Sequence, residues 1–196
     1  MTGAELRRAA AAARELLVSV GDGSARVPAM DDDVAGVTAH VTGCLIWYAQ
    51  DLAAGPEGAD GFTLGRRPEA GLPELVRQQG AAAEVLARTV EGAAPTDRGR
   101  HDWGRPDASG FAAMGGAELL LHTGDVAGAL GLPWRPPDDV ADAVLVRLFP
   151  WAPRDADPVA ALLWATGRGE LPGHEPVTSW RWHCSPLEEW DGRRPV

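Results

Sequence analysis

Apolar residues recur every three to four positions along four long stretches of this 196-residue chain. That spacing gives an α-helix one continuous apolar face. Carboxylates, Ser or Pro open most of the stretches and Gly closes them, as is typical of helix starts and stops. We therefore predict four helices of bundle length, at 3–19, 34–54, 72–92 and 110–130, with Ser109 capping the fourth.

The connections between these helices indicate how the bundle is built. Long loops at 55–71 and 93–109 follow the second and third helices, which is typical of a four-helix bundle with crossover connections. Two shorter helices are expected within 136–151 and 157–169, and each is introduced by Pro and Asp.

Beyond the second short helix the helical periodicity is lost. We therefore expect an all-α bundle at 1–168 and an irregular, Trp-rich tail at 169–196 that packs on it, with one short extended piece at 178–183. Large aromatic side chains bury much surface each, so tryptophans are expected to clamp the tail onto the bundle. They are Trp151, Trp164, Trp180, Trp182 and Trp190.

Composition excludes several classes of function. The formal net charge of -10 argues against a nucleic-acid partner, which calls for a basic surface. No apolar run reaches the roughly 18–20 residues that cross a bilayer, and the charged N-terminal stretch lacks the apolar core of a signal peptide. We expect a soluble, cytoplasmic protein with no nucleic-acid or membrane partner. A homodimer stays open, because no face is apolar enough to prove one.

One pair on the fourth predicted helix has the spacing of metal ligands. Glu118 and His122 are four residues apart, which puts them on one helical face. A carboxylate and an imidazole both bind Zn²⁺ or a similar ion. His40, inside the second helix, is expected to face the bundle interior and to complete a set of two His and one Glu with a fourth position open. Spacing alone leaves two other interpretations, a solvated Glu–His face and a core histidine.

Two stretches carry a resemblance to a known family. "VTAHVTGCLIWYAQDLAAG" and "FAAMGGAELLLHTGDVAGALGLP" resemble the metal-bearing helices of the DinB-like bundle superfamily. More closely, they resemble the N-terminal domain of the mycothiol-dependent maleylpyruvate isomerases of actinobacteria. The closing stretches "LLWATGRGELPG" and "WRWHCSPLEEWDG" are similar to tails of actinobacterial members. The resemblance spans nearly the whole chain, although the full isomerase carries a further C-terminal domain where this chain has an irregular tail.

The resemblance implies a function as well as a fold. It implies that His40, Glu118 and His122 hold a divalent metal, usually Zn²⁺, and that mycothiol is the thiol co-substrate in the open position. The metal lowers the pKa of the thiol, and the thiolate attacks a small electrophilic substrate. Asp125, one turn beyond His122, is a candidate partner for a ligand imidazole, with a solvated Asp as the alternative.

Two loops offer candidate contacts for the cofactor or the substrate. His101 and Trp103 lie on the loop that leads into the fourth helix, and such loops often border bundle pockets. Arg66 and Arg67 lie on the earlier loop, where they could hold an anionic thiol or a substrate carboxylate, or could only solubilise the surface.

The two cysteines make neither a disulfide framework nor a Cys-based metal site. Cys44 falls one turn after His40, so it could border the site, but packing as a small core residue is the preferred interpretation. Cys184 follows His183 directly, and adjacent residues of an extended chain point to opposite faces, so catalysis by this pair is not expected.

The leading expectation is a metal-dependent enzyme, a mycothiol-using transferase or isomerase acting on a small electrophile. Two other classes stay open, because a shared fold does not fix the chemistry. One is metal-assisted hydrolysis, or another small-molecule reaction, on the same bundle. The other is a non-catalytic bundle that binds a small molecule or a partner and has a vestigial metal site.

Overall fold

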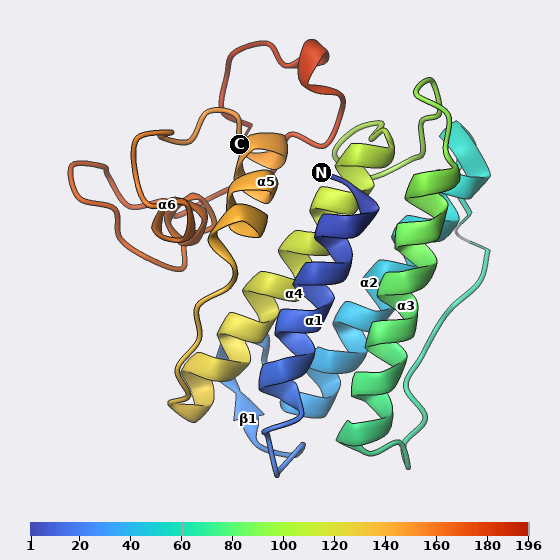
Figure 1. Cartoon of the computed structure of the whole chain (residues 1–196), viewed down its shortest axis with the longest axis vertical. Coiled ribbons are helices and arrows are strands. Elements are labelled where there is room, and N and C mark those ends of the chain that lie inside the picture. Colours follow the sequence, from blue (N-terminus) through green and yellow to red (C-terminus); the bar gives the residue numbers. More distant parts are fainter. Residues whose placement is uncertain (60, 196) are drawn as a thin grey trace.

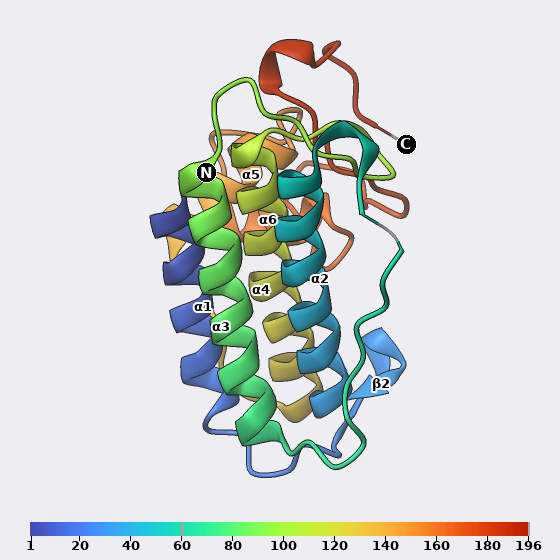
Figure 2. The ribbon, with the colours of Figure 1, turned by 90° about the vertical axis from the view of Figure 1, so that its right-hand side faces the viewer.

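The computed structural model describes residues 1–59 and 61–195, and helices dominate this part of the chain (Figure 1). Four helices stand side by side (Figures 1 and 2), with their most extensive contacts in the cyclic order α1, α3, α2, α4. Two shorter helices continue from one end of the bundle, where α5 packs on α4 and α6 packs on α5. The bounds are α1 Gly3–Leu17, α2 Val34–Ala54, α3 Leu72–Gly92, α4 Ala108–Leu130, α5 Asp138–Leu148 and α6 Pro158–Ala165.

The prediction of a predominantly helical fold is confirmed, and it differs in detail before α2. A two-stranded antiparallel hairpin, β1 Arg26–Val27 and β2 Asp32–Asp33, precedes α2, where the sequence had indicated only a helix start. Two residues per strand are too few to show an alternating pattern. Among the described residues, no helix combines the length and the apolar character needed to cross a membrane.

Carboxylate caps begin the two helices that matter most for the site. The side chain of Asp33 accepts a hydrogen bond from the Gly36 amide at the start of α2, at 2.6 Å. The cap of α4 is Asp107, which accepts from the Gly110 amide at 2.8 Å, and the prediction of Ser109 was wrong. A carboxylate caps a helix as well as a hydroxyl does and also favours the positive end of the helix dipole. The Ser109 hydroxyl instead donates to the Asp107 carboxylate.

Helix α4 is the most enclosed of the bundle helices. Every residue from Gly110 to Leu121 is buried, and the helix contacts α1, α2, α3 and α5. Small residues make this possible, because they let neighbouring helices approach the backbone closely. At Gly115, for example, an added Cβ would lie 2.7 Å from Cδ2 of Leu86 on α3. A polar side chain in this half of α4, such as Glu118, is therefore surrounded by protein.

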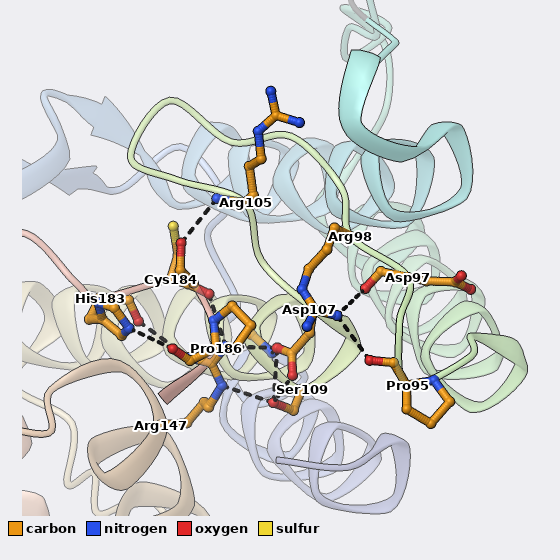
Figure 3. Close-up of polar contacts among 12 residues, drawn as sticks. Pro95, Asp97, Arg98, Arg105, Asp107, Ser109, Arg147, His183, Cys184 and Pro186 are labelled. Atoms are coloured by element: carbon orange, nitrogen blue, oxygen red, sulfur yellow. Dashed lines mark hydrogen bonds and ion pairs between the residues drawn. The ribbon is translucent and has the colours of Figure 1, made fainter. Parts of the chain in front are cut away.

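The tail is tied to the bundle by a buried arginine (Figure 3). Arg147 of α5 is 4% exposed. Its guanidinium donates to the Asp107 carboxylate at 2.7 Å and to the Ser109 hydroxyl at 2.8 Å. It also donates to the carbonyl oxygens of His183 and Cys184, at 3.3 and 2.9 Å. One side chain thus joins α5, the start of α4 and the backbone of the tail.

The tail itself is irregular, as expected, apart from a 3-10 turn at Leu187–Glu189. Residues 178–183 form no strand of a sheet. The backbone there has no strand beside it and bonds to the bundle instead, as where the His183 amide donates to the Leu148 carbonyl. Trp164 and Trp182 are buried, whereas the Trp190 ring nitrogen bonds within the tail to the carbonyl of Arg193.

Candidate metal centre

Three side chains from two neighbouring helices converge where α2 packs against α4. His40 lies on α2, and Glu118 and His122 lie on successive turns of α4. One ligand atom of each lies within 4.8 Å of the other two. Glu118 Oε2 is 3.1 Å from His122 Nε2 and 3.8 Å from His40 Nε2. The structure thus brings together the three residues that spacing and resemblance had singled out.

Glu118 is the buried member of the cluster, at 8% exposed. Its Oε1 accepts a hydrogen bond from the Tyr48 hydroxyl at 3.0 Å. Its Oε2 is buried and has no well-directed hydrogen bond from any described residue. Buried polar atoms are nearly always satisfied, and the contacts of this oxygen are the ion-pair distances to the two histidines. A cation held between Oε2 and the two imidazole nitrogens would satisfy all three atoms.

The spacing of the ligand atoms fits one small divalent ion. Two atoms that each lie about 2.1 Å from the same ion, at the tetrahedral angle, are about 3.4 Å apart. The observed contacts of Glu118 Oε2, at 3.1 and 3.8 Å, bracket that value. Two imidazoles and one carboxylate are also the donor set of several zinc sites with an open position. His40, Glu118 and His122 therefore fit a divalent metal.

A second carboxylate orients the His122 ring. Asp125 Oδ2 lies 2.9 Å from Nδ1 of His122, which directs the opposite nitrogen, Nε2, toward Glu118. Asp125 is itself held by Arg168, whose Nε and Nη2 each donate to one carboxylate oxygen at 3.0 Å. A carboxylate on the far side of a ligand imidazole is a recurrent feature of metal sites, because it fixes the tautomer and makes the ring a better ligand.

The charges of the cluster determine the protonation of His122. Burial disfavours the charged form of Glu118, but the contacts with His122, Tyr48 and His40 together outweigh burial and lower the pKa of Glu118. Burial also disfavours a charged His122, yet Asp125 and Glu118 together raise its pKa to about 9. In the metal-free protein, His122 therefore holds a proton between two carboxylates at neutral pH. A cation that binds there has to displace that proton.

The cluster reaches the surface at His40. This side chain was expected to face the bundle interior, and that expectation was wrong, since it is 48% exposed. Neighbouring positions of α2, such as Val41, take the interior face instead. A pocket of about 520 Å³ lies against His40 and is also lined by Cys44 and Arg66. A second pocket, of about 470 Å³, shares Cys44 and is lined by Tyr48. Residues 61–71 of the connection after α2 run down the outside of that helix (Figure 2). Phe62 of this stretch lines the second pocket, and Arg66 lines the first.

The two loop arginines have different surroundings. Arg66 lines the pocket beside His40, and its guanidinium lies 3.4 Å from the Asp33 carboxylate. Arg67 lines neither of the two pockets and pairs with Glu74 at 2.7 Å. Of the pair, only Arg66 is placed to meet a ligand that reaches His40.

The other loop places one of its two candidates beside a pocket. His101 lines the second pocket, and its ring centroid is 6.1 Å from that of Tyr48. Burial lowers the pKa of His101. Trp103 packs on the tail, with its ring centroid 5.1 Å from that of Trp182, and does not line this pocket.

The cysteines also differ from one another. Cys44 is only partly buried and borders the site, with Sγ 3.6 Å from His40 Nε2. Burial and the charge of Glu118 raise the pKa of the Cys44 thiol. Cys184 is a buried residue of the tail, and burial raises its pKa to about 11. The neighbouring His183 ring faces the Pro186 carbonyl at 3.0 Å (Figure 3).

Two residues of the site were missed at the level of the sequence. Tyr48 lies eight residues after His40, two helical turns along α2, and this spacing could have drawn attention to it. Arg168 follows α6 and reaches Asp125 across 43 positions of sequence. No local pattern connects two residues so far apart.

Fold and site together define a helical-bundle protein with a candidate divalent-metal centre between α2 and α4. Comparison of the chain with family models, with curated proteins and with solved structures finds no match.

Proposed function

We propose that this chain is a DinB-like bundle that holds a divalent metal, such as Zn²⁺, and uses a small thiol of the mycothiol kind to attack a small electrophile. Such an enzyme would be a transferase or an isomerase. The observation that carries the proposal is the buried Oε2 of Glu118, which faces two imidazole nitrogens and has no well-directed hydrogen bond from a described residue.

When bound, a divalent ion lowers the pKa of a coordinated thiol and so supplies a thiolate at neutral pH. The residues of the chain supply the remaining requirements. Glu118 and the two histidines would hold the ion, Tyr48 fixes the carboxylate, and Asp125 fixes the ring of His122. The pocket beside His40, at about 520 Å³, is in the size range of small-molecule sites. Arg66 gives that pocket a positive group for an anionic part of a ligand.

Metal analysis tests the centre on which this function depends. Protein stripped with a chelator, reloaded with Zn²⁺ and desalted should retain about one ion per chain. We expect His122→Ala to lower the affinity for the metal by roughly tenfold or more while its circular dichroism stays helical. His174→Ala is the matched control, because His174 is an exposed tail residue, and it should bind as the wild type does. If the wild-type protein retains no metal after it has been treated with Zn²⁺ and desalted, the proposal is excluded.

A second measurement addresses the thiol. Zn²⁺-loaded protein should accelerate the conjugation of mycothiol to a generic aryl halide electrophile, and the His122→Ala variant should not. Metal retention with no acceleration by any thiol would point instead to hydrolysis or another metal-assisted reaction on the same bundle.

One observation favours a second candidate, a non-catalytic bundle. In the metal-free state the charges of Glu118, His122, Asp125 and Arg168 alternate and balance, so the cluster can persist as a structural ion-pair chain. On this alternative the stripped protein would be as stable as the reloaded one. On the leading proposal, excess Zn²⁺ raises the unfolding temperature, because a ligand that binds only the folded state stabilises it.

A further inference from the structure

We infer that the pocket beside Tyr48 is the site of the electrophile, that it takes an uncharged aromatic compound whose ring is conjugated with an oxygen acceptor, and that His101 binds this oxygen through Nε2. The inference rests on the proposed function, because it names the substrate class of the same site. It leaves the pocket beside His40, which Arg66 lines, to the thiol.

Aromatic side chains line the pocket beside Tyr48. With Tyr48 and His101 they are Trp47 and Phe62, and the volume of about 470 Å³ accommodates a small molecule. Trp47 is 48% exposed and Phe62 is 64% exposed, so two large apolar rings of this pocket face solvent. A flat ring bound against them would cover that apolar surface. The ring of an electrophile is poor in electrons and therefore stacks well on the electron-rich face of an indole.

The charged side chains among the described residues of this pocket favour a ligand without net charge. They are Asp51, Arg100 and Asp102, so the carboxylates outnumber the guanidinium. An anionic ligand would meet net negative charge here. A cationic ligand would be repelled by the divalent ion of the neighbouring centre.

The pocket adjoins both the candidate metal centre and the pocket assigned to the thiol. Tyr48 lines it, and the hydroxyl of Tyr48 donates to Glu118 Oε1 at 3.0 Å. Cys44 lines this pocket and also the pocket beside His40. Two ligands, one in each pocket, would therefore meet next to the metal ligands.

A backbone contact fixes the position of the proton on the His101 ring. The amide of Trp103 donates to Nδ1 of His101 at 3.1 Å, so Nδ1 is an acceptor, and the neutral ring holds its proton on Nε2. Burial lowers the pKa of His101, which favours this neutral form at pH 7. On the opposite side of the ring, Nε2 has no hydrogen bond to a described residue. Its N–H can therefore donate to a ligand.

The tail holds the turn that carries His101. His101 and Gly104 exchange two backbone hydrogen bonds, each at 3.1 Å. The amide of the next residue, Arg105, donates to the hydroxyl of Ser185 in the tail at 3.2 Å. The ring centroid of Trp182 lies 6.0 Å from that of His101. The Trp-rich tail thereby supports one wall of the pocket.

An N–H donor at this place suits the charge that develops when a thiolate adds to a conjugated ring. The proton of the thiol has passed to solvent before the attack. As the sulfur–carbon bond forms, a π bond of the ring breaks and its electron pair moves to the conjugated oxygen, where the N–H of His101 stabilises the negative charge. With an aryl halide the pair then returns to the ring, the carbon–halogen bond breaks, and the halide leaves with the bonding pair.

Ligand-detected NMR titrations test the pocket without a reaction. The probes are acetophenone, which has a ring and a conjugated oxygen, toluene, which has the ring alone, and cyclohexyl methyl ketone, which has the oxygen without an aromatic ring. Both chelator-treated and Zn²⁺-loaded protein should bind acetophenone at least roughly threefold more tightly than cyclohexyl methyl ketone. Phe62→Ala should weaken the binding of acetophenone and toluene by roughly threefold or more. Leu64→Ala is the matched control, because Leu64 is also exposed but lines the pocket beside His40, and it should bind both as the wild type does.

His101→Phe separates the hydrogen bond from the shape of the ring. This variant keeps a flat ring and removes the donor, so it should weaken the binding of acetophenone by roughly threefold to tenfold and leave that of toluene unchanged. His101→Gln keeps an N–H donor and should retain the preference for acetophenone over toluene. A purely structural role of His101 would instead weaken the binding of both probes equally in His101→Phe, and that result overturns its role as the donor.

The possible results separate this inference from the proposed function. Equal affinities for acetophenone and cyclohexyl methyl ketone, or equal effects of Phe62→Ala and Leu64→Ala, overturn the assignment of the pocket. A protein that retains Zn²⁺ but binds no aromatic probe overturns this inference and leaves the metal centre standing. A protein that binds the aromatic probes as expected but retains no Zn²⁺ excludes the proposed reaction and leaves the pocket as an aromatic-binding site.

Discussion

Asp125 orients the His122 ring of the candidate centre, although its own carboxylate does not face the proposed ion. Its carboxylate lies between the Nδ1 side of the His122 ring and the guanidinium of Arg168. A protonated His122 ring in this partly buried position costs free energy unless opposite charges lie beside it, and Asp125 is one such charge. The pKa of His122 in the metal-free protein therefore measures directly how strongly the Asp125 carboxylate stabilises the protonated ring.

The metal-free protein should show a strongly raised pKa at His122. The pKa is raised from 6.5 to about 9 in the folded chain, so the protonated ring stabilises the fold fully below about pH 6.5, and this contribution is lost as the pH rises through about 9. Histidine ring signals in NMR spectra of chelator-treated protein measure the midpoint. Asp125→Asn should lower it by about one unit or more, because an adjacent opposite charge is removed.

His101 serves as the internal control in the same spectra. Burial lowers its pKa below 6.5, and Asp125→Asn should leave it unchanged. A wild-type His122 midpoint at or below that of an ordinary histidine would contradict the ion-pair arrangement at this ring.

The part of the site that the sequence predicted is the part that helical geometry encodes. Glu118 and His122 had to share a face of α4, because they are four residues apart. The exposure of His40 was not predictable in the same way, since it depends on how α2 is rotated against α4. Arg168 was beyond prediction for a similar reason, because only the folding of the chain after α6 brings it to Asp125.

At the scale of the element, α4 shows why its glycines are not interchangeable. Gly110 faces the tail, and an added Cβ would lie 2.6 Å from the Cys184 carbonyl oxygen and 2.7 Å from Nη2 of Arg147. Gly128 lies near the other end of the same helix, and nothing is within 4 Å of the corresponding position. Both residues are helical, so alanine would improve the helix propensity at both.

Gly110→Ala and Gly128→Ala should consequently have effects of opposite sign. Overpacking costs about 1–3 kcal/mol where the neighbour is backbone that cannot yield, against about 1 kcal/mol gained in helix propensity. We expect Gly110→Ala to lower the free energy of unfolding and to loosen the tail, and Gly128→Ala to raise it by up to about 1 kcal/mol. Urea denaturation followed by circular dichroism measures both. Equal effects of the two substitutions would show that the contact of the tail with α4 does not constrain Gly110.

At the scale of the whole molecule, the sequence predicted the helices better than their assembly. Apolar periodicity gave Leu72–Gly92 with the bounds that the structure has, and Gly131 ends α4 with a positive φ of 64°, as a closing glycine should. The tail has no periodicity to follow. Its course is set by single contacts between distant residues, and Arg147 makes the most extensive of these. In the sequence, Arg147 is not distinguishable from the other charged residues of α5.

Arg147→Met should release the tail while leaving the bundle folded. Methionine fills a similar volume, but it leaves the Asp107 carboxylate without its charge partner and the carbonyls of His183 and Cys184 without a donor. Breaking a buried ion pair from one side costs about 3 kcal/mol or more. We expect a lower free energy of unfolding, faster proteolysis within 169–195 and red-shifted tryptophan fluorescence, since the rings of Trp180 and Trp182 lose their cover.

Arg154→Ala is the matched control for this prediction. Arg154 also pairs with an aspartate, Asp142, at 2.7 Å, but both side chains are nearly half exposed. Exposed ion pairs contribute about 0–1 kcal/mol, so this variant should unfold and resist protease almost as the wild type does. An Arg147→Met protein whose tail resists protease as the wild type does would show that the tryptophans hold the tail without the arginine.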